Sequence, residues 1–196
     1  MKSEFVNETN WIIDKIHSEI GFKVKHLMIA SVKGNFRQFD AQITTWKKDF
    51  SRANIFMTIE SDSIQTGDRE RDEHLISPDF LDAMNFAQIC FKSSGVTPSG
   101  LKGAHIIQGG LTILGITKPV ELNAQFGGIM LDPWGNEKAG FQVTGEIDRR
   151  DWGLQWNTRL KTGGFLIGDK VTIQCDLELI NATQRAMVRN QEYVLR

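Results

Sequence analysis

The chain has 196 residues, of which 24% are charged and 40% hydrophobic, and its formal net charge is −1. This length suits a single all-β domain, and the near-zero charge gives no indication of a nucleic-acid or membrane-surface partner, since both usually bind through a basic patch. No apolar run approaches the roughly 18 residues of a transmembrane helix, and residues 1–8 lack the basic start and apolar stretch of a secretory signal. We therefore expect a cytoplasmic protein without stable membrane insertion.

Alternating apolar and polar residues predict antiparallel strands along most of the chain, because successive side chains of a strand point to opposite faces. In chain order, the candidate strands cover residues 11–13, 22–26, 32–39, 54–60, 89–94, 101–108, 111–114, 120–126, 141–148 and 171–179. Short turns rich in Gly, Pro and Asn separate them, as in a β-sandwich or a β-barrel. We favour a barrel, because closure removes the exposed strand edges that invite aggregation.

Two segments interrupt the alternation. Ser77, Pro78 and Asp79 are residue types that begin helices, which predicts a short helix over residues 78–84. Asn181 and Gln184 resemble a capping box, which predicts a C-terminal helix after residue 181. We therefore divide the chain into a barrel over residues 1–180 and a helical extension over 181–196 that is not a separate domain. Because this extension is a candidate for self-association, we leave open whether the protein forms a homodimer.

Candidate catalytic and metal-binding residues are sparse. His17 and Ser18 are adjacent, so a strand would point them to opposite faces. The charged run over residues 69–75 contains His74, but the remaining histidines are scattered without the spacing of a metal site. We therefore predict no catalytic residue, no metal site and no cofactor. The alternative is a lipid-acting enzyme that uses His26 or His74 as a general base.

The remaining functional signal is apolar. A barrel of about eight strands has an interior that either fills with side chains or holds one small ligand. The apolar positions that alternation places on the inner face of the strands predict the lining of that interior. Trp152 and Trp156 lie on one face of a further possible strand. The predicted lining is Phe22, Ile55, Met57, Ile59, Phe91, Leu122, Phe126, Phe141, Val143, Trp152 and Trp156. The same pattern fits a plain core, so a ligand-free barrel that acts as an interaction module stays open.

Short motifs between Trp11 and Leu179 resemble those of the YceI-like family of polyisoprenoid-binding proteins. Residues 11–18 are similar to its W-x-x-D-x-x-H-S start, and residues 22–36 to its F-x-V-x-H…V-x-G-x-F segment. Residues 63–82 resemble S-I-x-T…R-D-x-H-L…D-F-x-D, and residues 111–120 resemble L-T-I-x-G-V-T-K-P-V. Each motif is short, but together they follow the family's order and spacing.

This resemblance implies an all-β fold, namely an extended antiparallel lipocalin-like β-barrel. It also implies that the barrel encloses a long apolar ligand, such as a polyisoprenoid, an isoprenoid quinone or a fatty acyl chain, and carries or sequesters it without catalytic residues. Arg71, Asp72 and His74 then have a scaffold role beside the barrel mouth. Relatives are often periplasmic or secreted, which leaves the compartment open.

Overall fold

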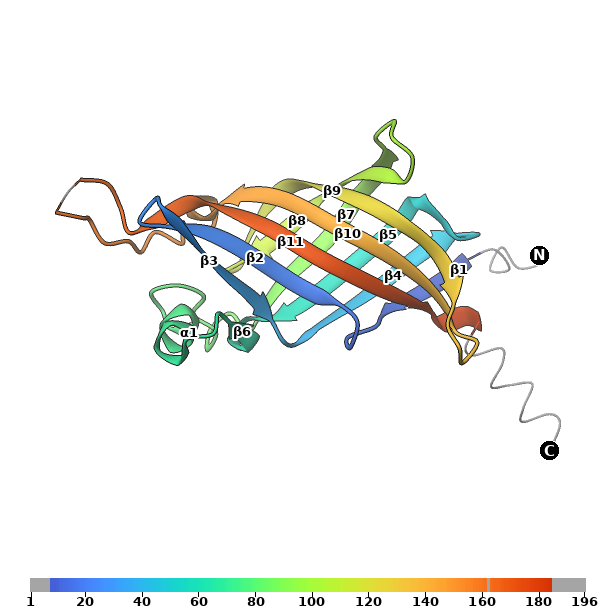
Figure 1. Cartoon of the computed structure of the whole chain (residues 1–196), viewed down its shortest axis with the longest axis horizontal. Helices are drawn as coiled ribbons and strands as arrows, with labels where there is room; N and C mark the ends of the chain where they lie inside the picture. Colours follow the sequence, from blue (N-terminus) through green and yellow to red (C-terminus); the bar gives the residue numbers. More distant parts are fainter. Residues whose placement is uncertain (1–7, 162, 185–196) are drawn as a thin grey trace.

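A computed structural model describes residues 8–161 and 163–184. The described chain is dominated by strands, with one α-helix and two short 3₁₀ helices between them (Figure 1). The elements are β1 (Glu8–Ile13), β2 (Glu19–His26), β3 (Ala30–Phe36), β4 (Phe39–Trp46), β5 (Asp49–Glu60), η2 (Ser61–Ser63), β6 (Ile64–Gln65), α1 (Arg69–Ile76), β7 (Gln88–Pro98), β8 (Ala104–Ile113), β9 (Ile116–Leu131), β10 (Glu137–Asp148), η3 (Arg149–Trp152) and β11 (Ile167–Asn181). Among the described residues, no helix is both long and apolar enough to cross a bilayer.

Eight of the strands close into an antiparallel barrel. Their order is β1-β4-β5-β7-β8-β9-β10-β11, and β11 pairs back onto β1, with Trp11 opposite Asn181 and Ile13 opposite Leu179. Alternate side chains of these strands therefore point into one enclosed interior. The predicted all-β barrel is confirmed.

β11 pairs with two strands in succession along one edge. Near its end it pairs with β1, and nearer its start it pairs with β2, where Ile20 lies opposite Cys175. β3 continues the sheet beyond β2, and the two-residue strand β6 follows β3. The hydrogen-bonded sheet stops at β6, and α1 lies beside it at this end of the barrel (Figure 1). One end of the barrel is therefore bounded by a helix.

The helix predicted over residues 78–84 is wrong, because the helix in this region is α1, which ends before Pro78. Asp68 caps its start by accepting a hydrogen bond from the Arg71 N–H at 3.0 Å. At its end, the Ser77 hydroxyl donates to the His74 carbonyl at 2.7 Å. Pro78 has no N–H to continue the helix and disfavours helical backbone at the residue before it. Ser-Pro therefore marks a helix end here, and successive turns follow.

The predicted C-terminal helix lies mostly outside the described residues. Its first residues, 182–184, are helical, and the Asn181 side-chain oxygen accepts a hydrogen bond from the Gln184 N–H at 3.0 Å. This is the bond expected of a helix N-cap. Residues 185–196 lie beyond the described chain, so the division at residue 181 stays a prediction.

A cluster of ionisable side chains joins the strands where β1 gives way to β2. The Lys138 ammonium of β10 donates to the carboxylates of Asp14 and Glu178, at 2.9 and 2.5 Å. His17 Nδ1 lies 2.9 Å from the same Asp14 oxygen that Lys138 contacts. Asp14, His17 and Glu178 offer ligand atoms within 4.8 Å of one another, but Lys138 already supplies a positive charge to them. We therefore assign the cluster a structural role, in which it stabilises the junction between β1 and β2.

This cluster predicts a specific loss of stability in acid. Burial raises the pKa of Asp14, but hydrogen bonds from Lys138, His17 and the Ile16 N–H outweigh it and hold the pKa well below its ordinary value of 3.8. A carboxylate of this kind contributes stability that is complete above pH 3.8 and is lost as the pH falls below it toward the folded-state pKa. We expect Asp14→Asn to be less stable at neutral pH and to lose less free energy of unfolding over that acid range.

Urea unfolding at a series of pH values measures this effect. Asp40→Asn is the matched control, because Asp40 is exposed in its ion pair with Lys15 and such pairs contribute little. If Asp14→Asn kept the same dependence of stability on pH below 3.8 as the unsubstituted protein, the assignment of this cluster would be wrong.

Candidate ligand-binding site

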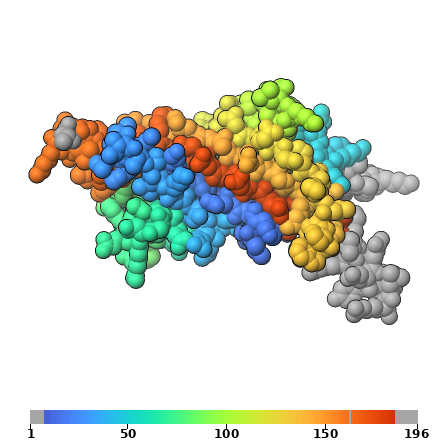
Figure 2. Space-filling model, viewed as in Figure 1, coloured from blue at the N-terminus to red at the C-terminus, as the bar shows by residue number. Residues whose placement is uncertain are grey.

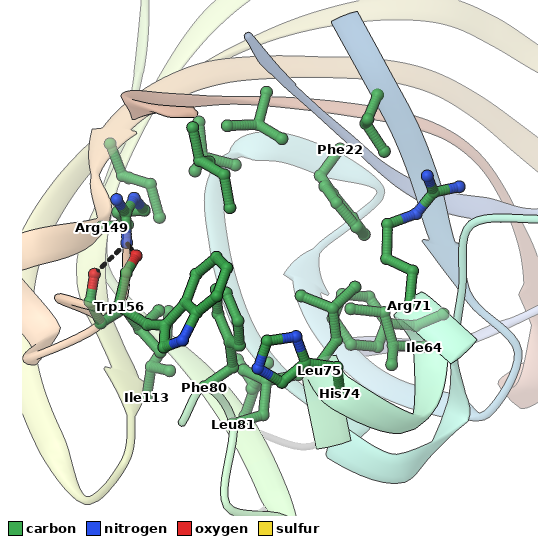
Figure 3. Close-up of a pocket in the computed structure, with 18 of the residues that line it drawn as sticks. Phe22, Ile64, Arg71, His74, Leu75, Phe80, Leu81, Ile113, Arg149 and Trp156 are labelled. Atoms are coloured by element: carbon green, nitrogen blue, oxygen red, sulfur yellow. Dashed lines mark hydrogen bonds between the residues drawn. The ribbon is translucent and has the colours of Figure 1, made fainter. Parts of the chain in front are cut away.

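A cavity of about 630 Å³ lies inside the barrel at the end beside α1 (Figure 3). We call it the outer cavity. Its volume falls within the range of about 300–1,000 Å³ typical of small-molecule sites. Its apolar walls come from strands β2, β3, β5, β6, β8, β10 and β11, from α1 and the turns after it, and from the segment between η3 and β11. They include Ile20, Phe22, Val24, Val32, Phe36, Ile59, Ile64, Leu75, Phe80, Leu81, Leu111, Ile113, Ile147, Leu154, Trp156, Leu166, Val171 and Ile173.

A second cavity of about 140 Å³, the inner cavity, adjoins the first further along the barrel. The two share wall residues, namely Ile20, Ile59, Leu111 and Ile173. Beyond the inner cavity, three aromatic rings pack together, with centroids of Phe50 and Phe141 4.8 Å apart and of Phe126 and Phe141 5.0 Å apart. Trp11 packs on Phe50 from the side of β1. This aromatic cluster fills the barrel on the far side of the inner cavity.

The eleven residues predicted to line the interior fall into three groups. Phe22 and Trp156 line the outer cavity, and Ile59 lines both cavities. Six line the inner cavity: Ile55, Met57, Phe91, Leu122, Phe141 and Val143. Phe126 and Trp152 do not belong to the lining of either cavity. Which of these residues contact a ligand stays a prediction.

The two exceptions have different physical reasons. Phe126 lies directly opposite Phe141 in the β9–β10 ladder and belongs to the aromatic cluster, where neighbouring rings take up the space around it. Trp152 is 2% exposed, and its indole N–H donates to the Leu111 carbonyl at 3.0 Å. It ends the 3₁₀ helix η3, so the expectation that Trp152 and Trp156 share a strand face is wrong.

Arg149 explains why the chain after Trp152 is not a strand. Its guanidinium donates to the carbonyls of Leu154 and Trp156, the latter at 3.0 Å (Figure 3). It also donates to the Gly168 carbonyl at 3.1 Å. Burial lowers the pKa of Arg149, and Asp169 opposes that shift; an arginine stays charged in either case. Carbonyls that would pair with a neighbouring strand are bound by this side chain instead. Arg149 thereby holds the wall segment that carries Leu154 and Trp156.

Several wall residues come from the end of the charged run over residues 69–75 and from the segment where a helix was predicted over residues 78–84, and none of them was predicted to line the interior. Leu75 at the end of α1, with Phe80 and Leu81 in the turns after it, lines the outer cavity. Phe80 and Leu81 are each 7% exposed. The available signal was an Asp68 cap followed by a charged helix that ends in apolar residues. A helix of this kind, with a polar first half, lies across a cavity mouth rather than within the core.

Arg71 lies at the edge of the outer cavity, on α1. Its Nε donates to the Thr66 hydroxyl at 2.7 Å, and its terminal nitrogen to the Thr66 carbonyl at 3.0 Å. Asp72 in turn accepts from the Thr66 N–H at 2.8 Å. No carboxylate lies within ion-pair distance of Arg71 in the part of the chain that the structure describes. The residues expected to have a scaffold role make these hydrogen bonds, and a positive charge faces the cavity.

His74 belongs to an aromatic cluster at the same mouth. Its ring meets those of Trp156 and Phe80 edge to face, with centroids 4.7 and 5.1 Å away. Its Nε2 lies 2.9 Å from the Asp79 carboxylate. His26, the other candidate base, lines the outer cavity from β2. In the inner cavity, burial raises the pKa of the Cys175 thiol to about 11, so this thiol is protonated at neutral pH and is a poor nucleophile.

Comparison with known proteins places this barrel in a family. A family model described as the YceI-like domain matches residues 11–179. The UPF0312 protein SA2479 of Staphylococcus aureus (strain N315) is 37% identical over 171 residues, which cover 87% of this chain and 96% of that protein. The crystal structure of the Campylobacter jejuni YCEI protein is 28% identical with a TM-score of 0.68, covering 92% of this chain and 98% of that one.

A polyisoprenoid binding domain from Saccharophagus degradans has the same fold at 14% identity, with a TM-score of 0.58 over 87% of this chain and 98% of that one. The family model and the Staphylococcus aureus relative each cover most of the chain. The motif resemblance is thereby confirmed, and the chain belongs to the YceI-like family.

Proposed function

We propose that this protein binds a long apolar ligand in the outer cavity, with its tail reaching toward the inner cavity, and that it carries or sequesters this ligand. The observation that carries the proposal is a pair of adjoining cavities, of about 630 and 140 Å³, with predominantly apolar walls. The Saccharophagus degradans domain with the same fold is a polyisoprenoid binding domain, which supports a polyisoprenoid. An isoprenoid quinone or a fatty acyl chain has the same chemistry along its tail.

Burial of the tail supplies most of the affinity in this proposal. Each methylene group transferred from water contributes about 0.8 kcal/mol, so roughly ten of them offset the cost of association, which is about 4–15 kcal/mol. No charged anchor is needed along the tail. The inner cavity fits this role, because among the described residues its lining contains two polar side chains, those of His105 and Cys175, and is otherwise apolar.

The polar atoms at the mouth give the ligand a direction. Lys25, Arg71 and His74 line the outer cavity at the end beside α1, together with the acidic Asp68 and Glu70, whereas the opposite end of the interior is filled by aromatic rings. A polar or anionic head group therefore belongs at the α1 end, near Arg71, with the tail directed along the barrel. This orientation also leaves the head group nearest to solvent.

We propose binding rather than catalysis, with no cofactor and no metal. The pairing of His74 with Asp79 is the one observation that favours a second candidate, a lipid-acting enzyme, because such a pair resembles an oriented general base. His26→Ala and His74→Ala variants in a neutral-pH activity screen with lipid substrates distinguish the two. A turnover that either substitution removes would favour the enzyme.

Filling the outer cavity tests the proposed function. Val24 and Val171 lie opposite each other in the β2–β11 ladder, and both line the outer cavity. We expect Val24→Phe with Val171→Phe to remove most of the co-purified lipid while the melting temperature stays equal or rises, since the new rings occupy empty space. Native mass spectrometry, with solvent extraction of the same sample, measures both the lipid and its stoichiometry.

Gln174→Phe is the matched control, because Gln174 is exposed on the outside of β11. It should retain lipid like the unsubstituted protein. The proposal fails if the filled variant binds lipid as well as the unsubstituted protein. It also fails if the unsubstituted protein carries no lipid and takes up no added geranylgeraniol.

A further inference from the structure

Large apolar side chains are exposed at the same end of the barrel as the outer cavity. Met28 and Ile29, in the turn between β2 and β3, are 64% and 84% exposed, and Leu27 beside them is 38% exposed. Phe165, in the loop before β11, is 54% exposed. We call these four residues the rim surface. Figure 2 shows the turn and the loop projecting together at one end of the molecule, in blue and orange.

The turn and the loop are joined by backbone hydrogen bonding, and both adjoin the cavity mouth. The Leu27 N–H donates to the Leu166 carbonyl at 2.8 Å, and His26 lies opposite Ile167 in the β2–β11 ladder. His26, Leu166 and Ile167 all line the outer cavity. The exposed apolar side chains are therefore direct chain neighbours of cavity-wall residues.

The backbone conformation of the β2–β3 turn favours residue types other than Leu and Met. Leu27 and Met28 have φ values of 52° and 62°, so both are left-handed. They are the central residues of a turn, within a three-residue loop, that is closed by a hydrogen bond from the Ile29 N–H to the His26 carbonyl at 3.3 Å. Two left-handed central residues favour Asn-Gly, because large side chains are strained at positive φ. The turn thus keeps two large apolar side chains exposed in a conformation that works against them. Lys47 and Lys48 have the same backbone in another turn, so the β2–β3 turn is distinguished by its exposed apolar side chains, which contact with an apolar phase would remove from water.

The two segments that carry the rim surface contain only basic charged residues. Residues 20–39 contain four basic residues, Lys23, Lys25, Lys33 and Arg37, and residues 153–168 contain Arg159 and Lys161; neither segment contains Asp or Glu. The formal net charge of −1 conceals this local excess. The opposite end also exposes Met130 and Trp134, but Asp132 and Glu137 lie in the same hairpin. The rim surface therefore combines exposed apolar side chains with basic residues in the two segments that carry it, while Asp68 and Glu70 line the cavity mouth and Asp169 follows the loop.

We propose that the rim surface docks on an anionic lipid bilayer, with its apolar side chains entering the head-group region and the flanking lysines and arginines facing anionic lipids. Shallow insertion combined with basic residues is the general requirement for peripheral membrane binding. Docked in this way, the mouth of the outer cavity faces the bilayer, and an apolar ligand passes between the two without crossing bulk water. The direction of transfer rests on the proposed function, whereas the docking itself does not.

A turn replacement separates docking from folding. We expect Leu27→Asn with Met28→Gly to weaken binding to vesicles of phosphatidylglycerol and phosphatidylcholine in equal parts by on the order of 100-fold, since two apolar side chains no longer leave water. The same variant should have an equal or higher melting temperature, because Asn-Gly suits the turn. Vesicle co-sedimentation and thermal unfolding measure the two effects.

The control makes the same replacement at the other end of the barrel. Lys47 and Lys48 form a turn with φ values of 51° and 68°, so Lys47→Asn with Lys48→Gly changes an equivalent turn and removes two positive charges. It should bind these vesicles as the unsubstituted protein does. The proposal is overturned if the unsubstituted protein does not bind the vesicles, if Leu27→Asn with Met28→Gly binds them normally, or if the control loses as much binding.

Uptake of geranylgeraniol added from ethanol distinguishes this proposal from the proposed function. We expect the Leu27→Asn, Met28→Gly variant to take up the alcohol normally, because the cavity is unchanged, and to fail only with vesicles. If this variant lost both the uptake of geranylgeraniol and the binding to vesicles, the effect would lie in the cavity, and the docking assignment would be overturned.

Discussion

Arg149→Met is expected to lower the free energy of unfolding by about 4 kcal/mol, because the carbonyls of Leu154, Trp156 and Gly168 would each lose a charge-assisted hydrogen bond in a buried setting. Arg149 is 4% exposed, so water does not readily replace it. The substituted protein should also lose bound lipid, since the wall segment carrying Trp156 is no longer held. Urea unfolding and native mass spectrometry measure the two effects.

Arg150→Met is the matched control for this substitution. Arg150 adjoins Arg149 in the chain, but its side chain is more than half exposed in its pairs with Asp148 and Asp169. Exposed pairs of this kind contribute at most about 1 kcal/mol. Equal losses of stability in the two variants would show that net charge, rather than the three carbonyl contacts, explains the importance of this segment.

Trp152→Ala is expected to destabilise the barrel by about 3–5 kcal/mol, the usual cost of deleting a buried aromatic side chain. Trp152 is 2% exposed, and its loss would leave a void and remove a hydrogen bond to the Leu111 carbonyl. Because Leu111 lies in the wall shared by the two cavities, the interior would also change shape. Thermal and urea unfolding measure the destabilisation.

Trp134→Ala provides the comparison, since Trp134 is 81% exposed in the β9–β10 hairpin. Its free energy of unfolding should stay within about 0.5 kcal/mol of the unsubstituted value. A Trp152→Ala variant as stable as Trp134→Ala would contradict the packing described for η3 and β8.

The sequence by itself determined the barrel. Alternation at residues 171–179 predicts a strand with one packed face, and this segment lies within β11. The turn residues and the number of strands restrict the fold to a sandwich or a barrel, and the ordered motifs select the YceI-like family. These features are local or ordered along the chain, so they can be recognised without knowing which strands meet. The Asn181 cap is equally local, and the bond to Gln184 forms as expected.

Only the tertiary structure decided where the helix lies and which apolar residues face empty space. Ser and Pro suit both the start and the end of a helix, and the contacts of Ser77 with His74 fix it as an end. The spacing of Trp152 and Trp156 fits a strand, but the Arg149 side chain folds back along the segment and binds the carbonyls of Leu154 and Trp156. Phe126 and Phe141 have the same inward pattern, yet ring packing leaves only Phe141 on a cavity.

The rim surface shows the same limit over a longer distance. Leu27 and Phe165 are far apart in the sequence, and neither the short apolar run at residues 27–29 nor Phe165 shows by itself that the two lie together. The β2–β11 ladder brings them to one edge of the cavity mouth. Which exposed apolar residues form a patch depends on which strands pair. The net charge of the whole chain does not reveal the local basic residues either, because positive and negative charges cancel in the total. Composition and periodicity therefore predict the barrel, whereas long-range strand pairing decides which side chains are exposed at its open end.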